Sequence, residues 1–389
     1  NHDKKCLSCA KNGECEFQKL CADYGVEDEH KYEGMTIHYE KDTSMPHLIR
    51  DNNKCVLCRR CVAACNEQYV GVIGANNRGI DTAIGTPFEV GLSNVPCISC
   101  GQCTVVCPTG ALVEKDDTDK IWAALADPDK HVVVQTAPSI RATLGECFGM
   151  PIGTNVEGKM VAALRRLGFD KIFDTDFAAD LTIVEEANEL VERIKNNGTL
   201  PMITSCSPGW VKFCEYYYPD MLEHLSTCKS PQQMAGAVIK TYYADKMGID
   251  PKDIVSVSVM PCTAKKFEIG REDQSAAGVP DVDIAITTRE LSRMIMRAGI
   301  NFAYLPDEEF DSPLGEDTGA AVIFGATGGV MEAALRTAND WLTGKDNTDI
   351  DFTAVRGTQG LKQATVNING SDIKVAVASG AAAAKCVMD

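Results

Sequence analysis

The sequence lacks any long apolar run, and none of its stretches approaches the ~20 apolar residues that a membrane-spanning helix needs. It also lacks a basic segment followed by an apolar one at its start, so no secretory signal is expected. Positive charge is scarce, because 38 Lys and Arg stand against 55 Asp and Glu, for a net charge of −17. A nucleic-acid-binding protein would carry a basic surface instead. These absences argue against a membrane-spanning, secreted or nucleic-acid-binding protein.

Cysteine is scarce in most of the chain and dense at its start. Of the 18 cysteines, 12 lie in the first 107 residues of a 389-residue chain. A disulfide-stabilised secreted domain would be short and would carry a signal sequence. In a long chain without such a signal, dense cysteine predicts metal binding and a reducing cytoplasm. The chain length predicts two or three domains.

Composition divides the chain into three expected domains: residues 1–50, 51–118 and 119–389. The third has strand candidates, each followed by a helical pattern, which favours an α/β domain with parallel sheets. The predicted strands are residues 131–135, 200–205, 254–260, 283–287 and 320–324. The predicted helices are residues 156–167, ended by Gly168, and 182–195, ended by Gly198.

Two runs of cysteine share the spacing C-x2-C-x2-C-x3-C, and Pro108 follows the second run. This is the bacterial two-cluster ferredoxin pattern, in which the fourth cysteine of each run binds the other cluster. We therefore expect one [4Fe–4S] cluster on Cys55, Cys58, Cys61 and Cys107. We expect another on Cys97, Cys100, Cys103 and Cys65, within an α+β ferredoxin-like domain. Zinc, the alternative, prefers two C-x2-C pairs per ion, which this spacing does not provide.

The first residues hold a further set of soft ligands: His2, Cys6, Cys9 and Cys15. By ligand count the set fits either a zinc site of the Cys3His type or a [4Fe–4S] cluster with one imidazole ligand. The neighbouring ferredoxin pattern favours the cluster, which would be the third in the chain. Cys21 is left over, and we expect it to be a small buried apolar residue.

Taken together, these motifs resemble those of iron-only ([FeFe]) hydrogenases. The cysteine pattern of the first 107 residues is similar to their accessory domains and to the electron-input subunits of respiratory NADH dehydrogenase. Residues 204–210 (TSCSPGW) and 260–268 (MPCTAKKFE) resemble the first two active-site motifs of the hydrogenases. Residues 173–180 (FDTDFAAD) and 324–332 (FGATGGVME) also match that family. The resemblance covers nearly the whole chain.

The resemblance implies a cleft for the H-cluster, a [4Fe–4S] cubane bridged to a two-iron centre. It implies that Cys206 relays protons, that Cys262 binds the cubane, that Lys265 contacts a cyanide ligand and that Glu268 is a proton-path acid. The chain departs from the pattern at Ser207, where the family has a ligating cysteine, since a hydroxyl is a poor substitute for a thiolate on iron. Lys265 and Glu268 could instead form an ordinary surface pair.

The family's third motif, with two more ligating cysteines, is not found. Residues 375–385 resemble the strand and helix that precede it, and Cys386 stands alone as an expected structural cysteine. The matched positions supply one of four thiolates. We therefore expect a vestigial hydrogenase domain without an H-cluster, and no confident catalytic residue.

The expected function is an iron–sulfur electron-transfer subunit of a multi-subunit oxidoreductase. The resemblance implies a flavin-based electron-bifurcating complex that links ferredoxin to NAD(P)(H), with FMN or FAD and NAD(P) on a flavoprotein partner and further iron–sulfur subunits. The chain has no G-x-G-x-x-G of its own for a dinucleotide. One alternative is a genuine [FeFe]-hydrogenase subunit whose C-terminal loop is missing from this chain. Another is a non-catalytic hydrogen sensor, which would need a signalling domain.

Overall fold

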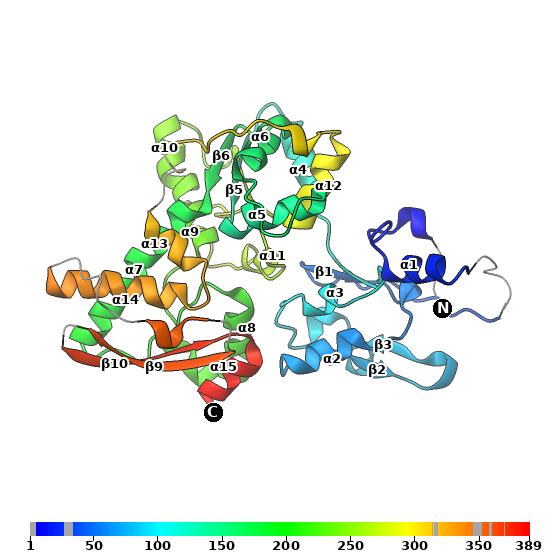
Figure 1. Cartoon of the computed structure of the whole chain (residues 1–389), viewed down its shortest axis with the longest axis horizontal. Helices are drawn as coiled ribbons and strands as arrows, with labels where there is room; N and C mark the ends of the chain where they lie inside the picture. The colour runs from blue at the N-terminus through cyan, green and yellow to red at the C-terminus, as the bar shows by residue number, and fades with distance from the viewer. Residues whose placement is uncertain are drawn as a thin grey trace. The chain divides into compact units, whose positions relative to one another are not determined.

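The computed structural model describes residues 5–26, 34–312, 314, 318–344, 352–357, 360–368 and 370–389 (Figure 1). The chain divides into two compact units, Asn1–Lys115 and Asp116–Asp389. Within the described ranges, no helix is both long and apolar enough to cross a membrane.

The first unit is built from two short antiparallel strand pairs and three helices. Strand β1 (Leu48–Arg50) pairs with β4 (Leu112–Glu114), and β2 (Gly74–Asn76) pairs with β3 (Ala83–Gly85). The helices are α1 (Glu16–Asp23), α2 (Arg60–Glu67) and α3 (Gln102–Val105). Its core joins apolar side chains from both cysteine repeats to three thiols, and includes Leu48, Ile73, Ile84, Leu92, Leu112, Cys61, Cys103 and Cys107. This is the α+β ferredoxin-like arrangement that the sequence predicts.

The second unit contains a four-stranded parallel sheet with the order β6-β5-β7-β8. Its strands are β5 (His131–Thr136), β6 (Lys171–Asp174), β7 (Ile254–Met260) and β8 (Ile284–Thr287). Helices cover the sheet (Figure 1), so its strands are buried and read as nearly continuous apolar runs. Three of them confirm predicted strands, whereas β6 was not predicted.

Most helices of the second unit follow the strands. They are α4 (Thr118–Leu125), α5 (Pro138–Thr143), α6 (Glu157–Leu167), α7 (Thr175–Lys195), α8 (Pro208–Tyr217), α9 (Pro231–Val238), α10 (Ala244–Met247), α11 (Lys265–Glu268) and α12 (Thr288–Arg297). Helix α6 confirms its prediction, and Gly168 ends it with a φ of 103°, a conformation that favours glycine. Helix α7 starts earlier than predicted, because the Asp174 side chain caps it by accepting a hydrogen bond from the Asp176 N–H.

The last part of the chain adds helices and a hairpin. These are α13 (Gly319–Phe324), α14 (Gly329–Thr343), β9 (Leu361–Ile368), β10 (Ser371–Ala378) and α15 (Ala381–Met388). Strands β9 and β10 are antiparallel, and apolar residues of the hairpin pack with Leu335 of α14 and Leu190 of α7. The strand and helix predicted within residues 375–385 are confirmed.

Two predicted strands are wrong. Residues 320–324 belong to helix α13, because Asp180 of α7 accepts hydrogen bonds from the Thr318 and Ala321 N–H groups at its start. Residues 200–205 form only an isolated bridge between Ile203 and Leu225. A short apolar run does not by itself distinguish a strand from a buried helical turn.

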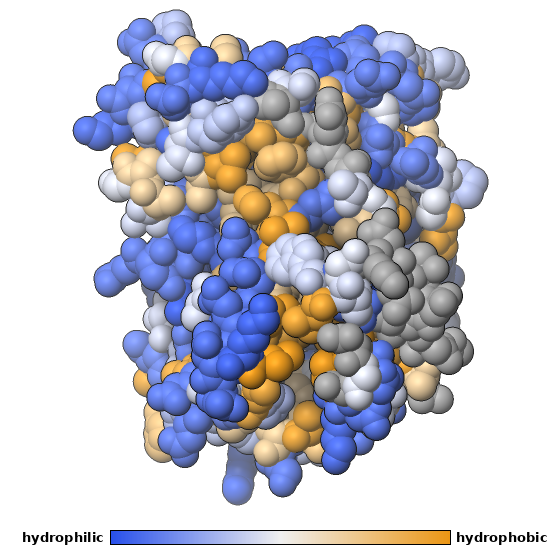
Figure 2. All heavy atoms as spheres, turned by 90° about the vertical axis from the view of Figure 1, so that its left-hand side faces the viewer, coloured by the Kyte–Doolittle hydropathy of each residue, from blue (hydrophilic) through white to orange (hydrophobic). Residues whose placement is uncertain are grey.

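Apolar side chains remain exposed on the three packed helices α7, α13 and α14. Val184, Val322 and Trp341 keep 44%, 68% and 47% of their surface in solvent. Figure 2, drawn from the side on which α13 and α14 lie in Figure 1, shows apolar side chains running between polar borders. Contiguous apolar surface is typical of a face that binds another protein.

Candidate functional site

The two cysteine repeats of the first unit share one loop conformation. Leu57 and Arg59 are left-handed, with φ of 57° and 63°. At the same positions of the second repeat, Ser99 and Gly101 have φ of 60° and 71°. Each loop leads directly into a helix, α2 or α3. The backbone therefore follows the same path around the first three cysteines of each run.

The thiols of the two runs fall into two groups that exchange their last members. Burial, with smaller contributions from the charges of Cys107, Cys55 and Cys58, raises the pKa of Cys61 to about 12. Burial likewise raises the pKa of Cys103, with contributions from the charges of Cys100, Cys97, Cys61 and Cys65. Cys107 therefore lies with the first loop, and Cys65 lies near the second.

A cavity is enclosed by the thiols Cys55, Cys58, Cys61 and Cys107. Its other walls include Arg50, Ile84, Thr109 and Leu112, and no carboxylate lines it. Thiols with a positively charged rim suit an anionic iron–sulfur cluster.

The cysteines at the start of the chain converge on the segment that follows Cys107. The Cys15 thiol donates a hydrogen bond to the Pro108 carbonyl at 3.5 Å. A Cβ atom on Gly110 would lie 2.4 Å from the Cys9 sulfur, so glycine leaves the space that this sulfur occupies. Cys6 lies in a short 3-10 helix, Cys6–Ser8. The predicted ligand His2 lies outside the described residues.

Two cysteine predictions need correction. Cys21 is half-buried rather than buried, because it lies on helix α1, which buries none of its residues. Cys386, expected to be structural, is exposed on α15.

In the second unit, Lys265 connects two of the candidate residues. Its ammonium donates to the Cys206 backbone oxygen at 3.0 Å and to the Glu268 carboxylate at 3.0 and 2.9 Å. Ser230 and Gln232 also donate to Glu268, each at 2.8 Å. The Lys265 and Glu268 side chains are only 12% and 8% exposed, so the surface pair considered from the sequence is in fact sheltered.

Ser207 of the first active-site motif and Cys262 of the second differ in burial. Ser207 is exposed and occupies the N-cap position of helix α8 without a capping side-chain hydrogen bond, whereas Cys262 is half-buried just beyond β7. Burial raises the pKa of the Cys206 thiol to about 11, and the charge of Glu186 contributes to the same shift. Cys206 is therefore a protonated thiol at neutral pH, with an acidic side chain nearby.

Glu186 is a functional candidate that the sequence interpretation missed. It is fully buried on α7, and its carboxylate oxygens have no hydrogen-bond partner among the described residues. Burial, and then the charge of Glu189, raises the pKa of Glu186 to about 7. The signal was present in the sequence, because Glu186 falls on the apolar face of the predicted helix beside Ile183 and Ala187.

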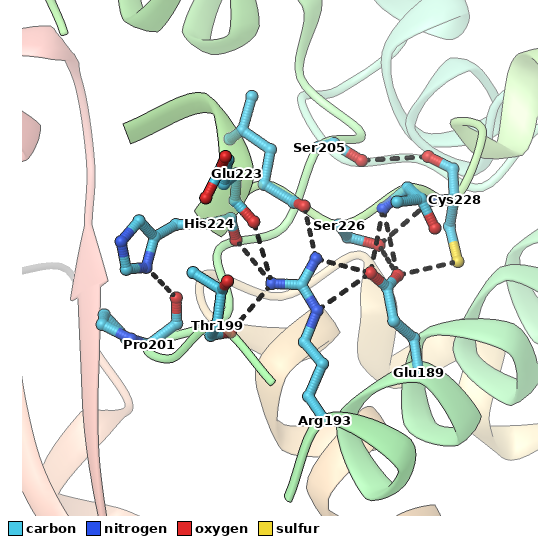
Figure 3. A network of polar contacts seen from close by, with 11 residues as sticks. Glu189, Arg193, Thr199, Pro201, Ser205, Glu223, His224, Ser226 and Cys228 are labelled. Carbon is cyan, nitrogen blue, oxygen red and sulfur yellow. Dashed lines mark hydrogen bonds and ion pairs between the residues drawn. The ribbon is translucent and has the colours of Figure 1, made fainter. Parts of the chain in front are cut away.

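A polar network is built around Glu189 and Arg193, one helical turn and two turns along α7 from Glu186 (Figure 3). Ser226 donates to Glu189 at 2.8 Å and also affects the pKa of Glu186, so it lies between the two acids. Arg193 pairs with Glu189 at 2.6 Å and donates to the backbone oxygens of Thr199, Glu223, His224 and Leu225. Arg193 thereby connects Glu189 to the segment at Thr199 and to the segment at residues 223–225. Glu189 and Arg193 are 15% and 13% exposed, so the network extends toward solvent.

Fold and cysteine sites together define an iron–sulfur protein with a parallel α/β lobe. Residues 130–389 match the family "Iron only hydrogenase large subunit, C-terminal domain". Residues 54–111 match a 4Fe-4S dicluster domain, and residues 1–30 match an iron–sulfur binding region of NADH-ubiquinone oxidoreductase-G. The chain belongs to the iron-only hydrogenase large subunit family.

Similar proteins include the NADP-reducing hydrogenase subunit HndD of Solidesulfovibrio fructosivorans, 54% identical over 98% of this chain. Iron hydrogenase 1 of Clostridium pasteurianum is 48% identical, also over 98% of this chain. A solved apo [FeFe]-hydrogenase, a HydA1 variant from Chlamydomonas reinhardtii, is 40% identical with a TM-score of 0.60. That match covers 70% of this chain and 77% of the other.

The chain spans 66% of the length of each of the first two relatives. The cysteine count above is therefore a count over that stretch of the family only.

Proposed function

We propose that this chain is an iron–sulfur electron-transfer subunit of a multi-subunit oxidoreductase. The observation that supports it best is the cavity lined by Cys55, Cys58 and Cys61 of the first cysteine run together with Cys107 of the second. A shared ligand set of this kind ties two clusters into one small domain and keeps them close enough for electrons to pass.

Three clusters follow from the ligands on this chain. His2, Cys6, Cys9 and Cys15 would hold one, in a domain of residues 1–50. The two ferredoxin-type sets of residues 51–118 would hold the others. Each bound [4Fe–4S] cluster supplies a site for one electron. The protein supplies the thiolates, the buried surroundings and the positive rim of Arg50 and Arg59.

A second function is favoured for the lobe of residues 119–389, namely proton transfer to and from Cys206. Glu186 can hold a proton near neutral pH because burial raises its pKa to about 7. Ser226 can pass a proton between Glu186 and Glu189, since a hydroxyl both donates and accepts. Glu189 then exchanges protons with solvent, held in place by Arg193. The Cys206 thiol is the inner end of this route.

This route favours a hydrogen-converting lobe over a vestigial one. Burying a carboxyl group costs free energy, and a role in moving protons past Ser226 would account for Glu186 in this position. The residues of this chain do not by themselves complete the H-cluster ligand set, since Cys262 is the one matched thiolate and Ser207 replaces another. No step is therefore assigned to that cluster.

The proposed partners are those of a redox complex. One relative is named as a subunit of an NADP-reducing hydrogenase, which supports a flavoprotein partner that carries FMN or FAD and binds NAD(P)(H). Ferredoxin would exchange electrons with this chain, in an electron-bifurcating complex of the cytoplasm. The apolar residues Val184, Val322 and Trp341 offer a surface for such a subunit.

The cluster assignment is tested by removing the exchanged cysteines. Cys107→Ala should abolish the electron paramagnetic resonance (EPR) signal of the cluster on the Cys55 loop and leave the cluster on the Cys97 loop. Cys65→Ala should do the reverse, and Cys147→Ala, outside every ligand set, should change neither. Loss of a cluster from the mutated residue's own loop would contradict the exchange.

The second function is tested by infrared spectroscopy after anaerobic maturation. A hydrogen-converting lobe predicts carbonyl and cyanide bands in the protein that carries the complete family domain, and hydrogen evolution that falls in Glu186→Gln. Intact electron transfer without those bands would favour the vestigial lobe.

A further inference from the structure

The residue before the first cysteine distinguishes the two ferredoxin-type repeats. Lys54 precedes Cys55, whereas Pro96 precedes Cys97 at the matching position. Lys54 is 9% exposed and ends a 3-10 helix, Asn52–Lys54. In the part of the chain that the structure describes, its ammonium forms no ion pair. A buried lysine without a counter-charge is costly, so its position needs a reason.

Lys54 adjoins Cys55 in the sequence, and its side chain lies near Cys9. Its backbone carbonyl accepts a hydrogen bond from the Thr109 hydroxyl at 2.8 Å, which ties it to the segment after Cys107. Its Cδ atom is 3.3 Å from the point that a Cβ of Gly110 would occupy, and the Cys9 sulfur is 2.4 Å from that same point. The lysine stem and the Cys9 sulfur are therefore neighbours, while the next residue along the chain is Cys55.

The charge of Lys54 matters because of what the clusters carry. A [4Fe–4S] cluster with thiolate ligands is anionic, and reduction makes it more so. A positive charge held nearby in a medium of low dielectric constant stabilises the reduced form. The cluster on the Cys97 loop has proline at the equivalent position and lacks this charge.

We propose that Lys54 is the shared counter-charge of the cluster on Cys9 and the cluster on Cys55, and raises the reduction potential of both. This inference rests on the proposed function, since both clusters must be present. It makes Lys54 a residue that sets the energy of electrons at this junction, without binding iron itself.

The test is an anaerobic redox titration of the full chain, with the clusters followed by EPR spectroscopy. Lys54→Met should shift the midpoint potentials of the clusters on Cys9 and Cys55 to more negative values. The potential of the cluster on the Cys97 loop should not change. Lys54→Arg keeps the charge and should restore the potentials toward those of the unaltered chain. Lys19→Met removes an exposed lysine of α1 and should shift none of the three.

Unchanged potentials in Lys54→Met, with three clusters present, would overturn this inference and leave the proposed function standing. An equal shift of all three clusters would also overturn it. If Lys54→Met fails to retain iron, Lys54→Gln keeps part of the stem and removes the charge, and unchanged potentials there count equally against the inference. Absence of the cluster signals from the unaltered chain would overturn the proposed function as well.

Discussion

The Lys265 ammonium donates a hydrogen bond to the backbone oxygen of Cys206 at 3.0 Å. This single contact joins the loop before α8 to the turn α11, although the two motifs are far apart in the sequence. The same ammonium pairs with Glu268, so one side chain orients both the loop of the buried thiol and the acid.

Replacing Lys265 should therefore destabilise the second unit. Lys265→Met leaves the sheltered Glu268 without its cation, a change that costs about 3–5 kcal/mol for a buried pair. The double variant Lys265→Met/Glu268→Gln should recover part of that loss. All three tryptophans lie in this unit, at positions 122, 210 and 341, so tryptophan fluorescence during urea unfolding measures it selectively. A loss below about 0.5 kcal/mol would mean that the contact does not hold the two motifs.

Lys266, the next residue, makes a second buried ionic contact on α11. Its ammonium is 2.7 Å from Asp117 and 2.8 Å from Glu290, with the lysine side chain 3% exposed. Lys266→Met should lower the free energy of unfolding by about 3–5 kcal/mol. Lys120→Met is the matched control, because Lys120 pairs with the same Asp117 but is 67% exposed, and its loss should be about 0–1 kcal/mol. Equal effects of the two variants would contradict the buried role.

Glu186 predicts a pH dependence of stability. Its pKa is raised from 4.5 to about 7 in the folded chain, so the folded state binds the proton more tightly than the unfolded state. The stability that it contributes is complete below pH 4.5 and is lost as the pH rises through about 7. The full change is about 3 kcal/mol.

The free energy of unfolding of the Glu186→Gln protein should lack this pH-dependent contribution. Relative to the unaltered chain, it should become more stable between pH 5 and pH 8, as followed by tryptophan fluorescence. Parallel stability curves of the two proteins across this range would contradict a buried, titrating Glu186.

Gly110 predicts a selective loss of iron. Gly110→Ala places a Cβ 2.4 Å from the Cys9 sulfur, and a sulfur that binds iron cannot move aside freely. The variant should lose the iron of the first cluster, about four atoms per chain. Gly74→Ala is the control, since a Cβ there meets nothing within 4 Å. Full iron content in Gly110→Ala would place the first cluster elsewhere.

Periodicity and spacing predicted much of this architecture for identifiable reasons. The alternation of residues 254–260 predicted β7, and the glycine after residue 167 predicted the end of α6. Residues 320–324 were misjudged although Thr318 is a local N-cap, because the start of this helix also depends on Asp180 from a distant part of the chain. Residues 200–205 were misjudged because their backbone groups bond to one loop rather than to a strand: the His224 ring contacts the Pro201 oxygen, and Ile203 bonds to the backbone of His224 and Ser226.

The candidate site was predictable where ligand spacing is local and not where it depends on tertiary contacts. The spacing of the two runs predicts the crossing of Cys65 and Cys107, and Cys107 does line the same cavity as Cys55, Cys58 and Cys61. The proximity of Lys54 to Cys9, by contrast, arises from the packing of residues 9 and 110. Glu186 could not be recognised from a motif, because it belongs to none. What distinguishes it is its burial on the apolar face of α7, which depends on tertiary packing.

Iron quantitation combined with EPR spectroscopy on the anaerobically purified chain tests the central claim most directly. Three [4Fe–4S] clusters predict about twelve iron atoms per chain and three separable signals on reduction. A chain that binds zinc in these cysteine sites, or that holds iron for only one cluster, would contradict the account.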